Sequence, residues 1–227
     1  MIGLVLQARM GSSRLPGKVM MDLCGRPMLG HILDRLKRVN RSVAVIVATT
    51  IKSCDDIIEV FARREGVDCY RGDENDVLDR YYRIAQQYKL RHIIRATADN
   101  PFVDPEEIDR LIDLHIRTGA DYTHAFGLLP IGIGTECFTL TALERSWREG
   151  KCPNHREHVN EYIQERPHHF HIEVLDIPKE KQSPTLRLTV DTSDDFVVAT
   201  TIYQALYREG KYITTCEAIM SCGTSFV

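Results

Sequence analysis

A short segment near the N-terminus combines three cationic side chains with glycines and hydroxyl groups. Residues 7–18 read QARMGSSRLPGK and contain Arg9, Arg14 and Lys18. Arginine binds phosphate through two parallel hydrogen bonds, and lysine supplies a mobile point charge. Glycines let backbone N–H groups approach an anion closely. This combination predicts a loop that binds the phosphates of a nucleotide. The expected contacts come from Gln7, Ala8, Arg9, Gly11, Ser12, Ser13, Arg14 and Lys18.

Two alternatives apply to this loop. The stretch GSSRLPGK nearly matches the GxxxxGK[ST] pattern of P-loop proteins, but Val19 stands where that pattern needs a hydroxyl to bind the metal. A surface loop with incidental basic residues is the other alternative. Such a loop would not need two glycines, two serines and a proline directly after a buried strand, so we favour phosphate binding.

Two aspartates follow predicted strands in distant parts of the sequence. Asp99 comes after the strand expected at 92–96, and Asp191 after the strand expected at 186–190. The carboxyl ends of parallel strands share one edge of a sheet, where ligands bind. Mg²⁺ prefers oxygen ligands and uses one or two carboxylates together with substrate phosphates. We therefore expect both aspartates to bind Mg²⁺, although each would also suit the cap of a following helix.

Further polar residues lie beside these segments. Arg71 follows a short predicted strand and precedes Gly72, which places it within reach of the nucleotide. Arg95 lies inside an apolar run, where an unpaired charge is costly, so we expect a carboxylate or phosphate partner for it. Thr97 completes the expected nucleotide contacts.

A later segment carries cysteine and histidine side chains. Cys152, His155 and His158 would put two imidazole rings on one helical face, but no fourth zinc ligand lies at the usual spacing. We interpret the segment as the region that recognises an acceptor, through Arg156, Glu157 and His158. A solvated, charged helix face is the alternative.

The spacing of apolar residues and turn signals predicts an α/β fold with a mostly parallel central sheet flanked by helices. In the first half we expect strands at 2–6, 43–48, 67–70 and 92–96 and helices at 27–39, from Ser53 or Asp55 to 64, 76–88 and 105–117. In the second half we expect strands at 121–124, 136–138, 170–175 and 185–189 and helices at 140–148, 155–165 and 194–208. The Gly-rich stretch 127–134 indicates a loop approached by a ligand or partner. We interpret 1–227 as one domain, with 1–120 as its nucleotide-binding half and 121–227 as its acceptor-binding and dimerisation half.

Composition narrows the class of protein. The 227 residues carry 29 basic and 32 acidic side chains, a formal net charge of -3, which does not favour nucleic-acid or membrane partners. Seven scattered cysteines form no CxxC pair, which favours free thiols in a reducing compartment. The short apolar run at 2–6 resembles neither a signal peptide nor a membrane span. We expect a cytoplasmic protein.

Several motifs together resemble those of the CMP-sugar synthetases. The sequence is most similar to the cytidylyltransferase group named after spore-coat polysaccharide biosynthesis protein F. The matching segments are QARMGSSRLPGKVM (7–20), RGDENDVLDRY (71–81), RATADNPFVDPEEID (95–109), the region of Glu136, NHREHVNEYI (154–163) and LRLTVDTSDDF (186–196). The octulosonate-activating enzymes carry Gly-Asp-Glu-Pro at the third motif, whereas this chain has Ala98-Asp99-Asn100-Pro101, which leaves the acceptor open.

The resemblance implies a Rossmann-like, GT-A-like nucleotidyltransferase fold and a homodimer. It also implies Mg²⁺, CTP as substrate and pyrophosphate as product, with Glu136 near the acceptor. We therefore expect transfer of CMP from CTP to a small sugar, a keto-sugar acid such as a nonulosonate or octulosonate, for surface polysaccharide biosynthesis. Catalysis would rest on Arg14, Lys18, Asp99 and Asp191. The alternatives are another nucleotide or a sugar-1-phosphate acceptor, a GT-A-like glycosyltransferase, which would usually show an Asp-x-Asp motif, and a non-catalytic nucleotide-binding module.

Overall fold

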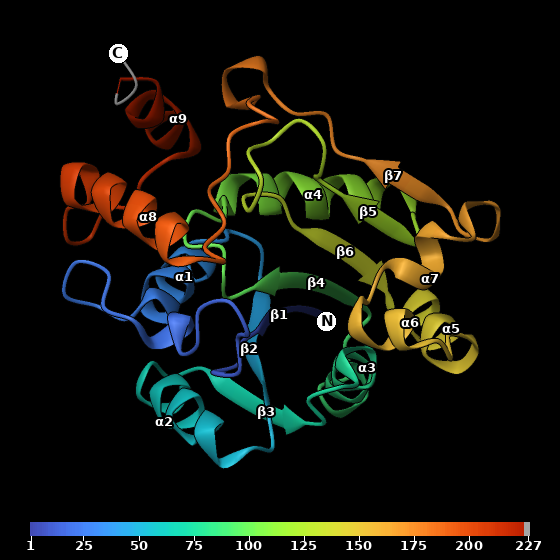
Figure 1. The fold of residues 1–227 in the computed structure, drawn as a ribbon. Helices are drawn as coiled ribbons and strands as arrows, with labels where there is room; N and C mark the ends of the chain where they lie inside the picture. The colour runs from blue at the N-terminus through green and yellow to red at the C-terminus, as the bar shows by residue number, and fades with distance from the viewer. Residues whose placement is uncertain (225–227) are drawn as a thin grey trace.

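Strands from both halves of the chain form one seven-stranded sheet in the computed structural model, which describes residues 1–224 (Figure 1). The last three residues of the predicted acceptor-binding half lie outside the described residues. The strands are β1 (Ile2–Gln7), β2 (Val43–Thr50), β3 (Asp68–Gly72), β4 (His92–Thr97), β5 (Tyr122–His124), β6 (Glu136–Thr139) and β7 (Ile172–Val174). Their order across the sheet is β3-β2-β1-β4-β6-β5-β7. β1 to β4 are mutually parallel where they pair, and β6 runs antiparallel to both β4 and β5. The expected mostly parallel sheet is confirmed.

The register of the central strands decides where the functional loops emerge. In the pair of β1 and β4, Gln7 lies opposite Thr97 at the carboxyl ends of both strands. The backbone N–H of Ala98 donates to the carbonyl of Gln7 over 2.9 Å. The loop after β1 and the turn that contains Asp99 therefore leave the sheet side by side.

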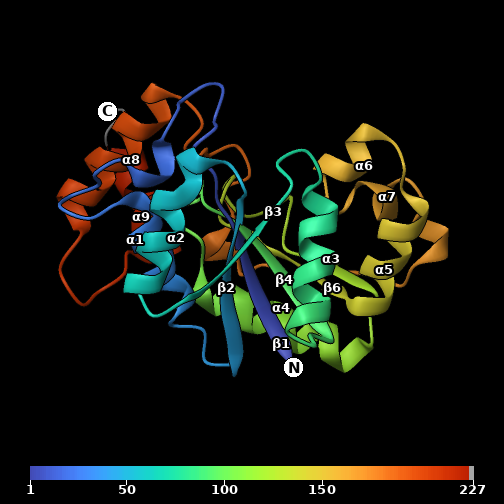
Figure 2. The same cartoon turned by 90° about the horizontal axis from the view of Figure 1, so that it is seen from below.

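Helices cover both faces of the sheet. Their bounds are α1 (Met28–Leu36), α2 (Asp56–Arg64), α3 (Val77–Gln87), α4 (Pro105–Thr118), α5 (Leu140–Glu149), α6 (Pro153–Glu157), α7 (Glu161–Gln164), α8 (Ser193–Leu206) and α9 (Thr215–Thr224). α1, α2, α4 and α8 pack in one apolar core and α3, α5 and α7 in the other. Figure 2 shows α1, α2 and α8 on one side of the central strands and α3, α5, α6 and α7 on the other. β1 separates the two cores, because Leu4 and Leu6 face the first while Val5 faces the second.

Carboxylates cap the start of two helices. Asp104 accepts hydrogen bonds from the backbone N–H groups of Glu106 and Glu107 at the start of α4. Asp76 accepts one from the backbone of Asp79 at the start of α3. These bonds satisfy N–H groups that have no partner within the helix.

Two expected elements take other forms. The expected strand at 185–189 is an extended segment with only an isolated bridge between Arg187 and Ile131. Its backbone bonds to two loops rather than to a strand, since Leu188 donates to Ile131 and Val190 to Asp99. The expected helix at 155–165 is divided into α6 and α7, because His158 is extended at the end of α6 and lets Val159 enter the core.

The final helix, α9, was not predicted. Its apolar residues do not recur with a clear helical period, so no sequence pattern indicated it. All seven cysteines are free thiols, as expected. Within residues 1–224 no helix has the length and apolar character needed to cross a membrane.

Candidate nucleotide-binding site

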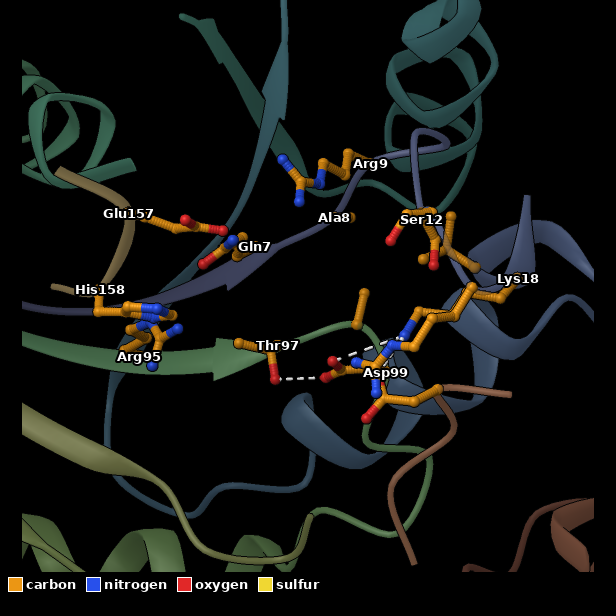
Figure 3. A pocket seen from close by; sticks show the side chains of 15 residues that line it. Gln7, Ala8, Arg9, Ser12, Lys18, Arg95, Thr97, Asp99, Glu157 and His158 are labelled. Atoms are coloured by element: carbon orange, nitrogen blue, oxygen red, sulfur yellow. Dashed lines mark hydrogen bonds and ion pairs between the residues drawn. The ribbon is translucent and has the colours of Figure 1, made fainter. Parts of the chain in front are cut away.

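A cavity of about 210 Å³ opens at the carboxyl edge of β1 and β4 (Figure 3). Its lining residues are Gln7, Ala8, Arg9, Ser12, Ser13, Arg14, Lys18, Val19, Arg95, Thr97, Ala98, Asp99, Glu157, His158 and Asp191. Most of these residues were singled out from the sequence, although they come from four separate segments of the chain, 7–19, 95–99, 157–158 and 191. Figure 3 shows Ser12, Lys18 and Asp99 toward one end of the cavity and Arg95 and His158 toward the other.

The loop after β1 turns back on itself and directs Lys18 inward. The backbone N–H groups of Ser12 and Gly17 both donate to the carbonyl of Met10 over 2.9 Å. Gly17 has a φ of 74°, a left-handed conformation that glycine adopts without steric cost. Lys18 then begins a 3-10 turn and is only 8% exposed. The glycine therefore allows the sharp turn that brings this lysine to the cavity wall.

Asp55 anchors the same loop from the neighbouring strand–helix connection. Its carboxylate accepts from the backbone N–H of Met10 over 2.7 Å and from the hydroxyl of Thr50. Asp55 is 1% exposed. Asp55 occupies the N-cap position of α2, one of the two positions from which the sequence expects the helix to start, but its side chain makes no capping hydrogen bond. Sequence reasoning missed this contact, because the two residues are 45 positions apart.

Lys18 joins the two predicted aspartates. Its Nζ lies 3.0 Å from Oδ1 of Asp191, 3.7 Å from Oδ2 of Asp99 and 2.6 Å from the carbonyl oxygen of Val190. A buried ammonium needs such acceptors, because desolvation without a partner is costly. The cationic loop and the two distant aspartates thus converge at one point of the sheet edge.

Asp191 is surrounded by cations. Besides Lys18, Nη2 of Arg14 lies 2.9 Å from Oδ1 and Nη2 of Arg187 lies 2.6 Å from Oδ2. Burial opposes ionisation, but the hydrogen bond and charge of Lys18 and the bond from Arg187 hold the pKa of Asp191 below its usual value. The alternative that Asp191 caps α8 is wrong, because Thr192 is the cap residue.

Asp99 has fewer cationic partners than Asp191. Its Oδ1 accepts from the hydroxyl of Thr97 over 2.5 Å, and its side chain is 30% exposed. Asp99 does not cap α4, whose cap is Asp104. Among residues 1–224 no three His, Cys, Asp or Glu side chains are grouped to hold a metal ion. Mg²⁺ commonly uses one or two carboxylates and takes its remaining ligands from phosphates and water.

The far end of the cavity carries Arg95 and His158. Nη1 of Arg95 donates to Oε1 of Glu136 over 2.7 Å across the pair of β4 and β6. The expected carboxylate partner of Arg95 is thus confirmed. Glu136 is fully buried and also accepts from the hydroxyl of Tyr122, so it supports Arg95 from behind and does not line the cavity.

Three other predicted contacts do not line the cavity. Arg71 faces α2, where its Nη1 lies 2.6 Å from Asp56 and 2.9 Å from Glu59, so its predicted contact with the nucleotide is not supported by its position. Arg156 donates to the carbonyl of Trp147. Gly11 lies at the exposed tip of the loop. Nearby carboxylates and carbonyl oxygens bind the side chains of Arg71 and Arg156. A sequence pattern does not show such contacts.

The histidines near α6 separate in the structure. His155 is 3% exposed and bonds Glu165 over 2.9 Å, whereas His158 is exposed and lines the cavity. The expectation that both rings share one helical face is wrong, because α6 ends at Glu157 and His158 is extended.

A second cavity adjoins the first and shares Thr97 and Asp99 with it. It has a volume of about 330 Å³ and is lined mainly by the Gly-rich loop and by Asn100, Pro184 and Thr189. Gly132 in this loop has a φ of 100°, and a Cβ there would lie 2.7 Å from the backbone nitrogen of Thr189. The loop therefore packs closely against the segment that leads to Asp191.

Several known proteins are similar to this chain. The profile of the family described as "Cytidylyltransferase" matches residues 3–213. The spore coat polysaccharide biosynthesis protein SpsF of Bacillus subtilis is 36% identical over 205 residues, 88% of this chain and 85% of that protein. A 3-deoxy-manno-octulosonate cytidylyltransferase of Escherichia coli is 29% identical over 109 residues, 48% of this chain and 44% of that protein. The solved structure of a cytidylyltransferase from Leptospira borgpetersenii superposes with a TM-score of 0.92 at 30% identity, covering 99% of this chain and 94% of that one.

Proposed function

Because this chain belongs to the cytidylyltransferase family, we propose that it transfers CMP from CTP to the hydroxyl of a sugar and releases pyrophosphate. The observation that carries the proposal is the meeting of Lys18 with Asp99 and Asp191 at the mouth of the phosphate loop. Cations next to a pair of carboxylates serve a reaction in which a polyphosphate and its metal ion must bind together.

The acceptor in this proposal is a keto-sugar acid used for a surface polysaccharide. Two relatives support it by name, one acting on 3-deoxy-manno-octulosonate and the other in spore coat polysaccharide biosynthesis. Arg95 and His158 also support it, since they offer nitrogen donors for a carboxylate at the end of the cavity away from the phosphate loop. The second cavity, which meets the first at Asp99, leaves room for the sugar ring.

The residues of the chain act by binding and orienting the reactants. The phosphates of CTP lie on the loop, where Arg14, Lys18 and the hydroxyls of Ser12 and Ser13 donate to them. The acceptor oxygen attacks the α-phosphorus, a new oxygen–phosphorus bond forms, and the bond from the α-phosphorus to the bridging oxygen breaks. The hydroxyl proton passes to solvent, and Arg14 and Lys18 balance the charge of the leaving pyrophosphate. Most of the acceleration then comes from position and electrostatics.

Asp99 and Asp191 would hold Mg²⁺ in this reaction. The ion would polarise the α-phosphate and stabilise charge on the attacking oxygen. The partial exposure of Asp99 leaves one of its oxygens accessible for this role. The absence of a third acidic or imidazole ligand among the described residues means that the ion should bind together with CTP rather than before it.

Release of pyrophosphate tests the proposal. Purified protein is mixed with CTP, ATP, GTP or UTP and with keto-sugar acids or sugar-1-phosphates, and turnover is measured with and without Mg²⁺. We expect turnover only with CTP and a keto-sugar acid. Asp99→Asn, Asp191→Asn and Lys18→Ala should each abolish most of it, whereas Lys151→Ala, at an exposed position outside the cavity, should not.

Three results would contradict parts of this proposal. Near-normal rates of either aspartate variant at saturating Mg²⁺ would refute the metal assignment. Equal use of another nucleotide would refute the assignment of CTP. Turnover with a sugar-1-phosphate but no keto-sugar acid would refute the acceptor class. Circular dichroism of each variant shows whether a loss of rate is a loss of fold.

A further inference from the structure

Arg80 of α3 is a buried cation without a visible partner. It is 1% exposed, and none of its three guanidinium nitrogens has a hydrogen-bond partner among residues 1–224. A guanidinium carries five N–H donors and keeps its charge in proteins. Burying a guanidinium without acceptors costs free energy, so a buried arginine of this kind lowers the stability of the folded protein.

Arg35 shows how this fold satisfies a buried arginine elsewhere. It is 2% exposed, and its nitrogens donate to the carbonyl oxygens of Val103, Ile213 and Phe102 over 2.6, 2.8 and 3.0 Å. The contrast with Arg80 is therefore local and does not reflect a general lack of acceptors in the protein.

Arg80 lies at the same edge of the sheet as the nucleotide cavity. Its stem covers Gly72, the last residue of β3, where a Cβ would lie 2.6 Å from Cγ of Arg80. Both residues belong to the stretch 71–81, a motif that the cavity does not use directly. The glycine therefore makes room for the arginine at the carboxyl end of β3, the edge of the sheet at which the cavity opens.

The nearest charges do not neutralise Arg80. Burial lowers the pKa of Arg80, and the positive charge of Arg9, which lines the cavity, lowers it further. Asp55 and Asp73 oppose these effects, but Asp55 is bonded to the phosphate loop and to Thr50. The like charges of Arg80 and Arg9 repel each other while the cavity holds no anion.

We propose that Arg80 is a positioning residue for the nucleotide, whose triphosphate supplies the countercharge that the protein lacks. The proposal rests on the use of CTP proposed above. Bound phosphates offset the repulsion between Arg9 and Arg80 and draw Arg9 toward them. Arg80 would then strengthen the binding of a polyphosphate at the expense of the stability of the free protein.

Substitution by methionine separates this role from a structural one. Arg80→Met removes the charge and keeps the apolar stem, while Arg35→Met is the matched control. We expect Arg80→Met to melt at the same temperature as the wild type or higher, since no hydrogen bond is lost. Its dissociation constant for CTP, measured by calorimetry, should rise about tenfold, and that for CMP much less, because CMP carries fewer charges. Arg35→Met should melt lower, because three buried carbonyls lose their donors.

Arg80→Lys tests the charge itself. It should retain most of the affinity for CTP if a positive charge is what matters. A lower melting temperature for Arg80→Met, comparable to that of Arg35→Met, would overturn the proposal in favour of a structural role. Unchanged CTP affinity in Arg80→Met, or equal losses for CTP and CMP, would also overturn it. Failure of the wild type to bind CTP would instead refute the proposed function.

Discussion

Acidification should weaken the fold because His115 is buried in its neutral form. His115, in α4, is 1% exposed, and its Nδ1 lies 2.8 Å from the hydroxyl of Thr123 in β5. Its Nε2 has no partner within residues 1–224, and its ring meets the edge of His92 at 5.2 Å between centroids. Protonation would place a charge in this apolar layer without an acceptor for the new N–H.

The size of the effect follows from the pKa. Burial, with a smaller effect of His92, lowers the pKa of His115 from 6.5 to about 4. The unfolded chain therefore binds a proton between these values that the folded chain does not. The contribution of His115 to the free energy of unfolding should fall as the pH drops through this window and change no further below about pH 4. A pKa difference of one is worth about 1.36 kcal/mol, so the full loss is about 3 kcal/mol.

Urea unfolding at pH 7 and pH 4.5 measures this loss. His115→Asn removes the titrating group and keeps a polar atom near Thr123. The stability of the wild type should fall between the two pH values by about 2 to 3 kcal/mol more than that of the variant. His168→Asn, at an exposed position, should behave like the wild type. Protonation of carboxylates lowers the free energy of unfolding of both proteins equally. Equal pH dependence of the wild type and His115→Asn would therefore refute the reasoning.

Three further predictions concern other parts of the molecule. Lys181→Met should lower the free energy of unfolding by about 3–5 kcal/mol, since Lys181 binds three carboxylates at 2.9 Å and two of them are buried. Thermal denaturation measures this loss of stability. Asp55→Ala should raise the KM for CTP severalfold by freeing the N–H of Met10, and Asp55→Asn, which keeps an acceptor oxygen, should raise it less. Gly132→Ala should lower the melting temperature, because its φ is 100° and the new Cβ would strike Thr189.

The sequence predicted the central part of the site because strand order determines it. Apolar runs at 2–6 and 92–96 indicated buried parallel strands, and the polar residues after parallel strands must meet at one edge. Lys18 and Asp99 follow these two strands, so their proximity could be expected. Asp191 reaches the same point although the segment before it is not a strand, since Val190 bonds directly to the backbone of Asp99.

Features that depend on tertiary contacts could not be predicted in the same way. Arg71 lies near the end of β3, but acidic side chains of α2 bind it, and no local sequence pattern predicts these contacts. The break at His158 places Val159 in the core, so packing rather than helix propensity ends α6. The hydrogen bond from the backbone of Met10 to Asp55 joins residues 45 positions apart, and no sequence motif indicates a contact between them.

The ring of cations around Asp191 has a consequence for which anions can enter the site. In the free protein an internal carboxylate already balances Lys18, Arg14 and Arg187, and its tether gives it a high effective concentration. An orthophosphate or sulfate ion offers too little to displace it, whereas a chain of three phosphates reaches several cations at once. In the proposed reaction the same carboxylate would compete for the lysine again when pyrophosphate departs. In the proposed reaction Asp191 would thus act as an internal competitor of small anions and of the leaving pyrophosphate.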